Sequence, residues 1–454
     1  MRITEARANG DRQTAVVVKA LFRGDRLREE PTAEIRRLAA TAGLEVVECL
    51  SQRLDRPHPA TYLGKGKVEE ASRRAAELDV DLLITDNDLS PAQERNLEKI
   101  SGRTIIDRSQ LIMDIFAQRA QTHQAKLQVE LAQLRYSMPR LKRLWTHLSR
   151  YEGGIGMRGP GETQLETDKR LIARRIQRIV RELKDIERRK EASVVARESE
   201  FVVALVGYTN AGKSTLLNAL THSRELVEDK LFATLDTRVR RWQLASHRHV
   251  LLTDTVGFIR DLPHHLVASF HATLAETREA DLLLHVVDAS SSDAPFEVQT
   301  VRDVLRELEV DEKPAWLVLN KWDAVPREKV IEARSIAFLS DRQGGPPAIV
   351  DAGGPGRGAA AASYTVSART GEGLEDLAAG VLEHVRREDT ELELTIPHDR
   401  GDVLAYIREN SEVRGTEYRT DGVHVGFRIS PARKARLRHL FPEAFPRPVP
   451  APWE

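Results

Sequence analysis

Residues 207–215 have the residue types and spacing that chemistry on a nucleotide phosphate requires. The segment reads GYTNAGKST, and the apolar residues on either side of it predict a strand before it and a helix after it. Its glycines allow backbone amides to face phosphate oxygens, Lys213 can reach the β- and γ-phosphates, and Ser214 can hold Mg²⁺. The sequence therefore predicts a phosphate-binding loop that consists of Gly207, Tyr208, Thr209, Asn210, Ala211, Gly212, Lys213, Ser214 and Thr215.

A second motif, LLTDTVG at 251–257, follows this loop in the chain. An apolar strand that ends in Asp254 would place a carboxylate beside the phosphates, where it would hold Mg²⁺ through a water molecule. The backbone amide of Gly257 is placed to sense the γ-phosphate. A further Mg²⁺ ligand is expected from a threonine between the two motifs, which orders a switch loop when it binds the metal. Thr234 and Thr237 are both candidates, and spacing alone does not choose between them.

Two later segments predict which base is bound. Residues 320–323 read NKWD and close an apolar strand. Guanine presents an N1–H and an exocyclic amine that the carboxylate of Asp323 can accept together, and a site built for such a polar edge rejects bases that lack it. Asn320 would brace the loop, and the stem of Lys321 would cover the base. The motif order therefore favours a GTPase over an ATPase, and a further guanine-contacting segment is predicted at Ser367, Ala368 and Arg369, with the Ala368 amide meeting guanine O6.

The elements that must position these residues form an alternation of strands and helices from residue 201 to 387. Strands are predicted at 202–206, 250–253, 282–287, 315–319 and 363–366. Such alternation predicts a parallel sheet flanked by helices. Within this region, residues 341–362 are rich in Gly, Pro and Ala, which predicts a disordered surface insertion.

A similar alternation occupies residues 14–118, where strands are predicted at 15–22, 44–50, 81–85 and 104–107. Ser90 and Gln93 predict the capping box of a helix in this region. The segment GKGK at 64–67 is interpreted as a turn, with a phosphate contact as the alternative. Cys49 is the only cysteine, so it excludes an internal disulfide and a cysteine zinc site, and we expect it to be buried.

Residues 119–190 differ from both alternations. Apolar residues at spacings of three and four predict two amphipathic helices, with Pro139 kinking the first and Thr163 capping the second. A glycine-rich stretch at 151–161 separates them, which predicts a helical hairpin. This segment contains eighteen basic and eight acidic residues, a net charge of +10. This charge has two interpretations. The hairpin binds the phosphates of a nucleic acid, or it is a solvated coiled coil with ordinary ion pairs along its helices. Charge alone does not distinguish the two interpretations.

The composition of the whole chain hides the excess of basic residues in segment 119–190. The 454 residues include 69 Lys and Arg and 69 Asp and Glu, so the formal net charge is zero. No run approaches the roughly 18 apolar residues of a membrane span, and Met1–Gly10 lacks the apolar core of a secretory signal. We therefore expect a cytoplasmic protein, taken to be monomeric, of α/β multidomain class. The predicted parts are an N-terminal parallel α/β domain (1–118), a basic helical hairpin (119–198), a P-loop GTPase domain (199–389) and a small α+β C-terminal domain (390–454).

The order and the amino-acid sequences of these motifs resemble those of the HflX GTPases, which belong to the Obg-HflX group of translation-factor-class P-loop GTPases. The similar segments cover nearly the whole chain: LGKGKVEE at 63–70, DIFAQRA at 114–120, KLQVELAQL at 126–134, GGIG at 153–156, GPGETQLETD at 159–168, LFATLD at 231–236, TVGFI at 255–259 and LPH at 262–264. The chain departs from the family at 237–240, where TRVR replaces the usual PTTR.

The resemblance implies both a partner and an activity. It implies an N-terminal domain and hairpin that meet ribosomal RNA, GTP hydrolysis stimulated by the large ribosomal subunit, and a role in splitting or rescuing stalled ribosomes. It favours Thr234 as the Mg²⁺ ligand. The alternatives are a GTPase of ribosome assembly or tRNA modification, or an RNA-remodelling NTPase acting through the N-terminal domain.

Two residues bear on how water would be activated. Many GTPases carry a Gln after D-x-x-G to orient the attacking water, and Phe258 occupies that position here. Hydrolysis is therefore expected to be slow until a ribosomal or RNA element orders the switch loops. Asn210 has two interpretations: it ligates K⁺ near the β- and γ-phosphates, whose charge then assists the reaction, or it only stabilises the loop through a backbone bond. We accordingly take Lys213, Thr234, Gly257 and Asn210 as the predicted catalytic residues.

Overall fold

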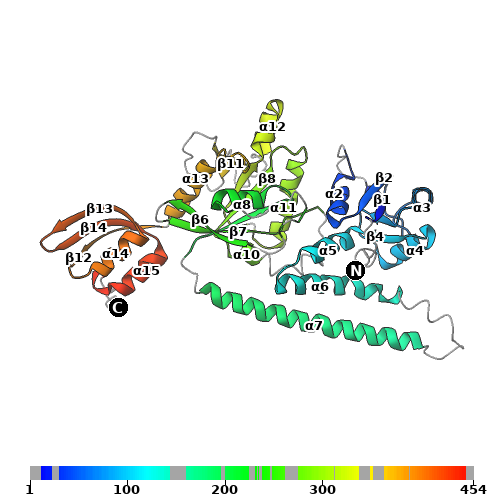
Figure 1. The fold of residues 1–454 in the computed structure, drawn as a ribbon, viewed down its shortest axis with the longest axis horizontal. Coiled ribbons are helices and arrows are strands. Elements are labelled where there is room, and N and C mark those ends of the chain that lie inside the picture. Colours follow the sequence, from blue (N-terminus) through cyan, green and yellow to red (C-terminus); the bar gives the residue numbers. More distant parts are fainter. Residues whose placement is uncertain are drawn as a thin grey trace, which may run out of the picture. The chain divides into compact units, whose positions relative to one another are not determined.

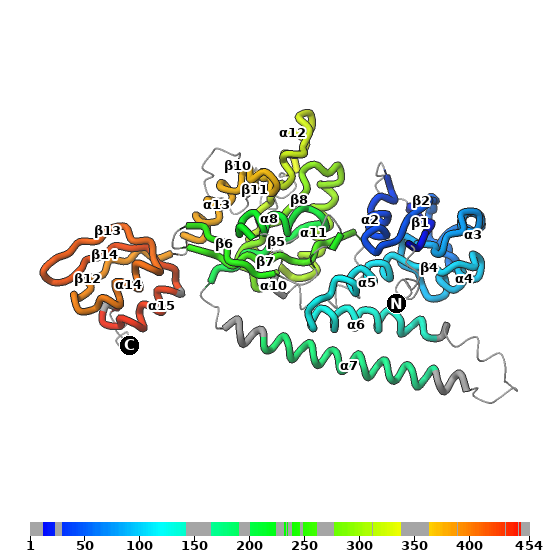
Figure 2. The backbone as a smooth tube through the Cα atoms, in the orientation of Figure 1, coloured from blue at the N-terminus to red at the C-terminus, as the bar shows by residue number. Residues whose placement is uncertain are grey.

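The computed structural model divides the chain into two compact units. Figure 1 draws its helices and strands, and Figure 2 traces the same backbone as a tube. One unit consists of residues 1–188, 227–236 and 256–275, and the other of residues 189–226, 237–255 and 276–454. The structure describes residues 12–22, 30–143, 160–195, 200–223, 231–232, 234, 238–245, 248–260, 275–310, 312–336, 348–350, 362–387 and 389–445.

The first unit contains a parallel sheet of four strands. The strands are β1 (Thr14–Phe22), β2 (Glu45–Leu54), β3 (Leu82–Thr85) and β4 (Thr104–Asp107), in the spatial order β2-β1-β3-β4. All neighbouring strands are parallel, as the alternation of strands and helices predicted. The chain runs from β1 to β2 on one side and then to β3 on the other, so the direction of the strand order reverses between β1 and β3.

Helices pack in two pairs on this sheet. One pair is α2 (Ala33–Ala42) with α5 (Arg108–Arg119), and the other is α3 (Lys65–Glu77) with α4 (Pro91–Ser101). The capping box of Ser90 and Gln93 is present at the start of α4. The basic segment 64–67 is not a separate turn, because Gly64 caps α3 and Lys65 begins it. Cys49 is half-buried rather than buried, because it lies on the edge strand β2.

The helical hairpin of the first unit differs from its prediction where the first helix ends and where the second helix begins. Its elements are α6 (His123–Ser137), the 3₁₀ turn η2 (Met138–Arg143) and α7 (Pro160–Val195). Pro139 ends the α-helix instead of kinking a longer one, since proline cannot donate the next helical hydrogen bond. Thr163 is not the cap of α7, because the helix already begins at Pro160, where proline suits the first turn. Residues 151–159 of the glycine-rich stretch lie outside the described residues.

Apolar and ionic contacts join the two hairpin helices. Leu127, Leu131 and Ile179 are buried together between α6 and α7. The guanidinium of Arg175 donates two hydrogen bonds of 2.7 Å to the carboxylate of Glu130. Such a fork-to-fork pair fixes the relative orientation of the two side chains, so it sets the register of the helices as well as stabilising them.

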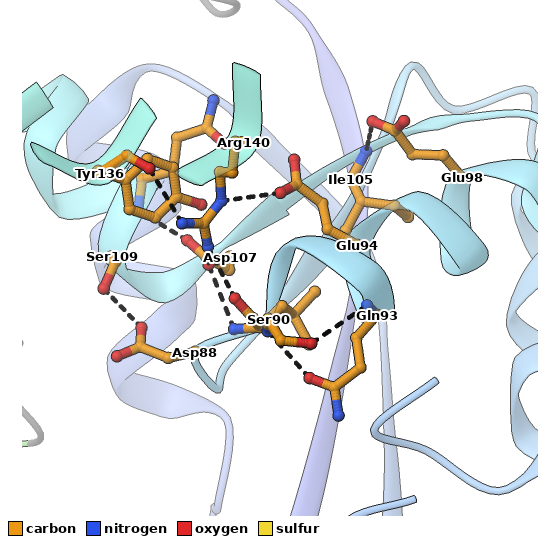
Figure 3. Close-up of polar contacts among 12 residues, drawn as sticks. Asp88, Ser90, Gln93, Glu94, Glu98, Ile105, Asp107, Ser109, Tyr136 and Arg140 are labelled. Atoms are coloured by element: carbon orange, nitrogen blue, oxygen red, sulfur yellow. Dashed lines mark hydrogen bonds and ion pairs between the residues drawn. The ribbon is translucent and has the colours of Figure 1, made fainter. Parts of the chain in front are cut away.

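A single arginine fastens the end of α6 to the N-terminal sheet (Figure 3). Arg140 lies 3.5 Å from the ring centroid of Tyr136, and it donates to Glu94 Oε2 (3.0 Å) and to the carbonyl of Leu89 (2.7 Å). It also donates to Asp107 Oδ2 at 3.4 Å. Burial raises the pKa of Asp107 to about 6, and the nearby Arg140 opposes that shift. The start of η2 is therefore held against both α4 and β4.

The second unit contains the larger sheet, in the order β10-β11-β9-β8-β5-β7-β6. Its central strands agree with prediction, and β6 and β10 were not predicted. β6 is antiparallel to β7, and the remaining neighbours are parallel. The strands are β5 (Val202–Gly207), β6 (Arg238–Ala245), β7 (Arg248–Asp254), β8 (Leu282–Asp288), β9 (Ala315–Asn320), β10 (Ala348–Val350) and β11 (Ala362–Thr365).

Helices and short turns complete this sheet. They are α8 (Lys213–Thr221), α10 (Ala275–Glu279), α11 (Ala294–Glu307), η3 (Trp322–Ala324), η4 (Arg327–Lys329), α12 (Val330–Ser335) and α13 (Leu374–Arg386). The sequence predicts disorder throughout 341–362, and this is wrong for residues 348–350 and for residue 362. Residues 348–350 form β10, which pairs in parallel with β11, and Ala362 begins β11. The other residues of that segment, 341–347 and 351–361, lie outside the described residues.

The chain ends in a small α+β domain with its own apolar core. Its sheet is antiparallel, in the order β12-β14-β13, with two helices and a short turn. The elements are β12 (Thr390–Ile396), α14 (Gly401–Asn410), β13 (Glu412–Arg419), β14 (Gly422–Ile429), α15 (Pro431–Leu440) and η6 (Pro442–Ala444). The α+β class is as predicted. The sequence predicts strands at 392–396 and 423–427 and helices at 402–409 and 431–440 in this region, and β13 is an additional strand.

Candidate nucleotide-binding site

The phosphate-binding loop connects β5 to α8, as predicted. Gly207 ends β5 with φ +156°, and a Cβ atom there would lie 2.2 Å from the carbonyl oxygen of Val286. Gly212 caps α8 with φ +92°, and a Cβ atom there would lie 2.3 Å from the Asn320 amide nitrogen. Both positions therefore require glycine for space as well as for backbone conformation. Asn210 adopts φ +63°, a left-handed conformation that asparagine tolerates better than most residues.

Lys213 is buried at the start of α8. Its ammonium group donates to the carbonyl oxygens of Gly207 (3.0 Å) and Tyr208 (2.8 Å), which hold it across the mouth of the loop. Burial lowers the pKa of Lys213 to about 8, and the Asp254 carboxylate opposes the shift. A triphosphate would supply negative charge at this position, so binding would favour the charged amine.

Two of the predicted Mg²⁺-binding residues lie together. The hydroxyl of Ser214 donates to Asp254 Oδ2 at 2.6 Å, and the Asp254 side chain is fully buried at the end of β7. Thr255, the next residue, donates from its hydroxyl to the carbonyl of Leu205 (2.7 Å), which ties β7 to β5. A hydroxyl and a carboxylate at the mouth of a phosphate loop are hard oxygen donors of the kind that Mg²⁺ prefers.

The base-recognition segments are joined to the phosphate loop through Asn320. Its side-chain NH₂ donates to the carbonyl of Ala211 (2.9 Å), and its side-chain oxygen accepts from the Ala368 amide (3.0 Å). Asn320 is buried, so these two bonds fix three loops against one another. The hydroxyl of Ser367 donates to Asp323 Oδ1 at 2.6 Å, which orients the carboxylate expected to bind guanine. Arg369 is exposed beside this pair.

Asp288 was not among the predicted site residues, although it ends β8 as Asp254 ends β7. Its carboxylate pairs with the ammonium group of Lys321 at 2.7 Å, and it accepts from the Ser290 hydroxyl at 2.6 Å. Lys321 has φ +58°. The ion pair anchors the lysine stem along the edge where the base is expected. The sequence signal that could have identified Asp288 is its position at the end of a predicted central strand.

The predicted switch residues belong to the other compact unit. Thr234 is buried, and Thr237 lies outside the described residues. Thr234 and Gly257 are part of the first unit, whereas the phosphate loop is part of the second. Their roles as Mg²⁺ ligand and γ-phosphate sensor therefore stay predictions, and the same holds for K⁺ binding by Asn210. Phe258, which replaces the water-orienting Gln, is buried.

Two other kinds of site are not found in the described part of the chain. None of its described His, Cys, Asp and Glu side chains gather in groups of three or more that could hold a metal ion. No described helix is both long enough and apolar enough to cross a membrane.

Family models match most of the chain. The model described as GTP-binding GTPase N-terminal matches residues 29–117, and the GTP-binding GTPase Middle Region matches residues 119–197. The model described as 50S ribosome-binding GTPase matches residues 202–321. The matched ranges include the phosphate loop and extend to Lys321, within the NKWD segment.

Curated proteins are similar over nearly the full length. GTPase HflX of Lacrimispora saccharolytica is 43% identical over 394 residues, which are 86% of this chain and 88% of that protein. GTPase HflX of Escherichia coli is 42% identical over 391 residues, 86% and 87% of the two chains. GTPase HflX of Caldanaerobacter subterraneus is 40% identical over 432 residues, 95% and 94%.

A solved structure is also similar, at lower identity. The GTP-binding protein of the hyperthermophilic archaeon Sulfolobus solfataricus, in complex with GDP, is 23% identical with a TM-score of 0.41. The match covers 82% of this chain and 98% of that one.

Proposed function

This chain belongs to the HflX family of GTPases, and from that premise we propose that its GTP hydrolysis is coupled to binding of the large ribosomal subunit. The chain is a GTPase with a P-loop fold. The observation that supports the nucleotide part most strongly is Asn320, which bonds both the phosphate loop and the segment of Ala368. Asn320 therefore links the segments proposed to bind the base to the loop proposed to bind the phosphates. We propose that hydrolysis serves to split or rescue stalled ribosomes.

Different residues of the chain would bind the phosphates, the base and the metal ion. Lys213 would leave its two carbonyl partners to neutralise the β- and γ-phosphates, and Asp323 would accept both guanine donors. Ser214 and Thr234 would hold Mg²⁺ directly, and Asp254 would hold it through water. The bound ion would supply positive charge that offsets the charge of the phosphates. Because Phe258 cannot orient water, the intrinsic reaction is slow and a partner completes the site.

The surface of α7 supports RNA as part of that partner. Among its residues with described side chains, the exposed acidic residues are Glu166 and Asp185, and the exposed basic residues are Arg170, Arg174, Arg178, Arg181, Lys184, Arg188 and Arg189. From Arg170 to Arg188 these cations follow one another at intervals of three to four residues, and Arg189 comes directly after Arg188. A helix face of this charge suits an array of phosphates, and contacts of this kind weaken as salt rises.

We also keep the division into four parts as a proposal, with boundaries after residues 118, 198 and 389. The N-terminal domain and hairpin would act on the ribosome, and the GTPase domain would time their action. We further propose that the protein works in the cytoplasm as a monomer.

We expect large ribosomal subunits to raise the rate of GTP turnover at least about tenfold, because an ordered partner supplies the missing water-positioning groups. The measurement is steady-state phosphate release with large subunits, with small subunits and with neither. Equal rates in all three conditions would contradict the proposal.

A charge-reversal pair separates RNA binding from catalysis. Arg174→Glu with Arg178→Glu on the exposed face of α7 should abolish stimulation and leave turnover without ribosomes unchanged. The matched control is Arg327→Glu with Lys329→Glu, which makes the same charge change on the exposed turn η4 of the GTPase domain. If both pairs reduce stimulation equally, the effect comes from net charge and not from α7.

We expect K⁺ to support faster turnover than Na⁺, provided that Asn210 ligates the ion beside the phosphates. The informative variant is Asn210→Gly, because glycine keeps the left-handed backbone at φ +63° that alanine would strain. Turnover of this variant should no longer distinguish the two ions. Identical wild-type rates in K⁺ and Na⁺ would leave Asn210 with only its role in loop conformation.

A further inference from the structure

One hydroxyl group of the phosphate-binding loop has no hydrogen-bond partner among the described residues. It belongs to Thr209, which is only 6% exposed. Its Oγ1 atom is shielded from solvent and makes no hydrogen bond within the described part of the chain. Most buried polar atoms of native proteins are paired, so an unpaired one inside a binding loop indicates a partner that comes from outside the protein.

The hydroxyl of Thr209 is unlike two other hydroxyls beside the loop, which have partners within the protein. Ser214 donates to Asp254, and Thr255 donates to the carbonyl of Leu205. A buried hydroxyl without a partner destabilises the folded state, whereas valine has nearly the same shape and does not carry this cost. Position 209 therefore carries a hydroxyl that does not help the described loop to fold.

The burial of Thr209 is compatible with a place in the phosphate site. Lys213, the amine expected to bind the β- and γ-phosphates, is also 6% exposed. Its ammonium group is covered while it donates to the carbonyl oxygens of Gly207 and Tyr208. A side chain of this loop can therefore be buried in the structure and still face the nucleotide when it binds.

Covalent geometry places the Thr209 hydroxyl close to the amine of Lys213. The carbonyl of Tyr208, which accepts from that amine at 2.8 Å, belongs to the peptide group that joins Tyr208 to Thr209. The standard dimensions of a trans peptide limit the distance from this carbonyl oxygen to Thr209 Oγ1 to about 5 Å, so Oγ1 lies at most about 8 Å from the amine. Two hydrogen bonds of ordinary length to different oxygens of one phosphate cover a separation of this size.

The order of residues along the loop favours the γ-phosphate as that group. After the left-handed turn at Asn210, the chain reaches the amides at the amino end of α8, which suit the phosphates that GTP and GDP share. Thr209 precedes this turn and directly follows the carbonyls that hold Lys213. Since Lys213 is expected to reach the γ-phosphate, we assign the Thr209 hydroxyl to the phosphate that only GTP carries.

We propose that the side-chain hydroxyl of Thr209 donates a hydrogen bond to a γ-phosphate oxygen of GTP and is a catalytic residue of hydrolysis. A fixed donor on this oxygen orients the phosphoryl group and offsets the charge of the transition state. It supplies a polar side chain to a site in which Phe258 replaces the usual glutamine. The proposal rests on the proposed binding of the phosphates by this loop.

Thr209→Val tests the proposal, because it removes the hydroxyl and nearly keeps the shape of the side chain. We expect kcat for GTP hydrolysis to fall at least about tenfold. Affinity for a non-hydrolysable GTP analogue should fall, whereas affinity for GDP should stay unchanged. Thr209→Ser keeps a hydroxyl and should retain most of the wild-type kcat. The unfolding midpoint of the nucleotide-free valine variant should not fall, since no protein hydrogen bond is lost.

The matched control is Thr277→Val, on α10 of the same compact unit. The hydroxyl of Thr277 is also buried without a hydrogen-bond partner in the described part of the chain, so the chemical change is the same. This variant should leave kcat and both affinities unchanged.

Four results would overturn the proposal. They are an unchanged kcat in Thr209→Val, an equal effect of Thr277→Val, a serine variant as slow as the valine variant, and an equal loss of affinity for GDP and the GTP analogue. The last result would assign the hydroxyl to loop conformation or to the shared phosphates. Failure of the wild type to bind either nucleotide would instead overturn the proposed function itself.

Discussion

Asp323→Asn is expected to lower GTP affinity at least about 100-fold and to create affinity for xanthosine triphosphate. In the proposed binding mode the carboxylate would accept from both guanine N1–H and the exocyclic amine. An amide could accept from only one of these, and its NH₂ would face the other donor. Xanthine carries a carbonyl oxygen in place of that amine, so the asparagine NH₂ regains a partner. The measurement is competition of both nucleotides against a fluorescent guanine nucleotide.

The geometry of the site makes this substitution a test of chemistry and not of folding. Asp323 is exposed, and the Ser367 hydroxyl that donates to it can donate equally to an amide oxygen. The control is Glu328→Gln, the same chemical change at an exposed position on η4, which should leave both affinities unchanged. A parallel loss of affinity for both nucleotides would show that Asp323 supports loop structure without discriminating the base.

Lys213→Met should reduce GTP turnover by about 10²–10³-fold, the typical cost of removing a preorganised donor to transition-state charge. The unfolding midpoint without nucleotide should change little. Burial lowers the pKa of Lys213 to about 8, so the charged amine is penalised in the empty site, and this penalty offsets the two hydrogen bonds lost. The rise in midpoint that GTP gives the wild type should shrink strongly.

Lys313→Met is the matched control for that experiment. Lys313 also donates to a backbone carbonyl of the same unit, that of Ala280 at 2.6 Å, but it lies outside the nucleotide site. Its replacement should leave turnover and the GTP-dependent rise intact. If the Lys213 variant hydrolyses GTP at the wild-type rate, the amine does not act on the phosphates.

The parts predicted from sequence are those whose signal is local. The loop from Gly207 to Ser214 has apolar runs on both sides. It has glycines at the two positions, 207 and 212, where a Cβ atom would clash with a neighbouring atom. The strands that end in Asp254 and Asn320 are buried on both faces, so they appear as continuous apolar runs. The positions of residues at the ends of such strands can therefore be predicted from the amino-acid sequence alone.

The strands that were missed lie at edges. β6 reads RVRRWQLA and buries only Trp242 fully, and β13 reads EVRGTEYR with most side chains exposed. Edge strands are paired on one side and solvated on the other, so they carry little hydrophobic pattern. The contacts of Phe232 with Phe116 and of Arg260 with Arg108 could not be predicted, for a different reason. They join residues more than 100 positions apart and depend on tertiary structure alone.

The discontinuous first unit has a consequence for biosynthesis. Arg108 and Arg260 are 152 residues apart, so at about 5–20 residues per second roughly 8–30 s pass between their translation. During this interval the nascent N-terminal domain can form its sheet. It still lacks Phe232, which packs on Phe116, and Arg260, which lies near Asp86. The domain thus completes its fold only after the first part of the GTPase domain, through residue 260, has been translated. A fragment that stops before residue 231 would present the same unfinished surface, and aggregation of such fragments would follow from it.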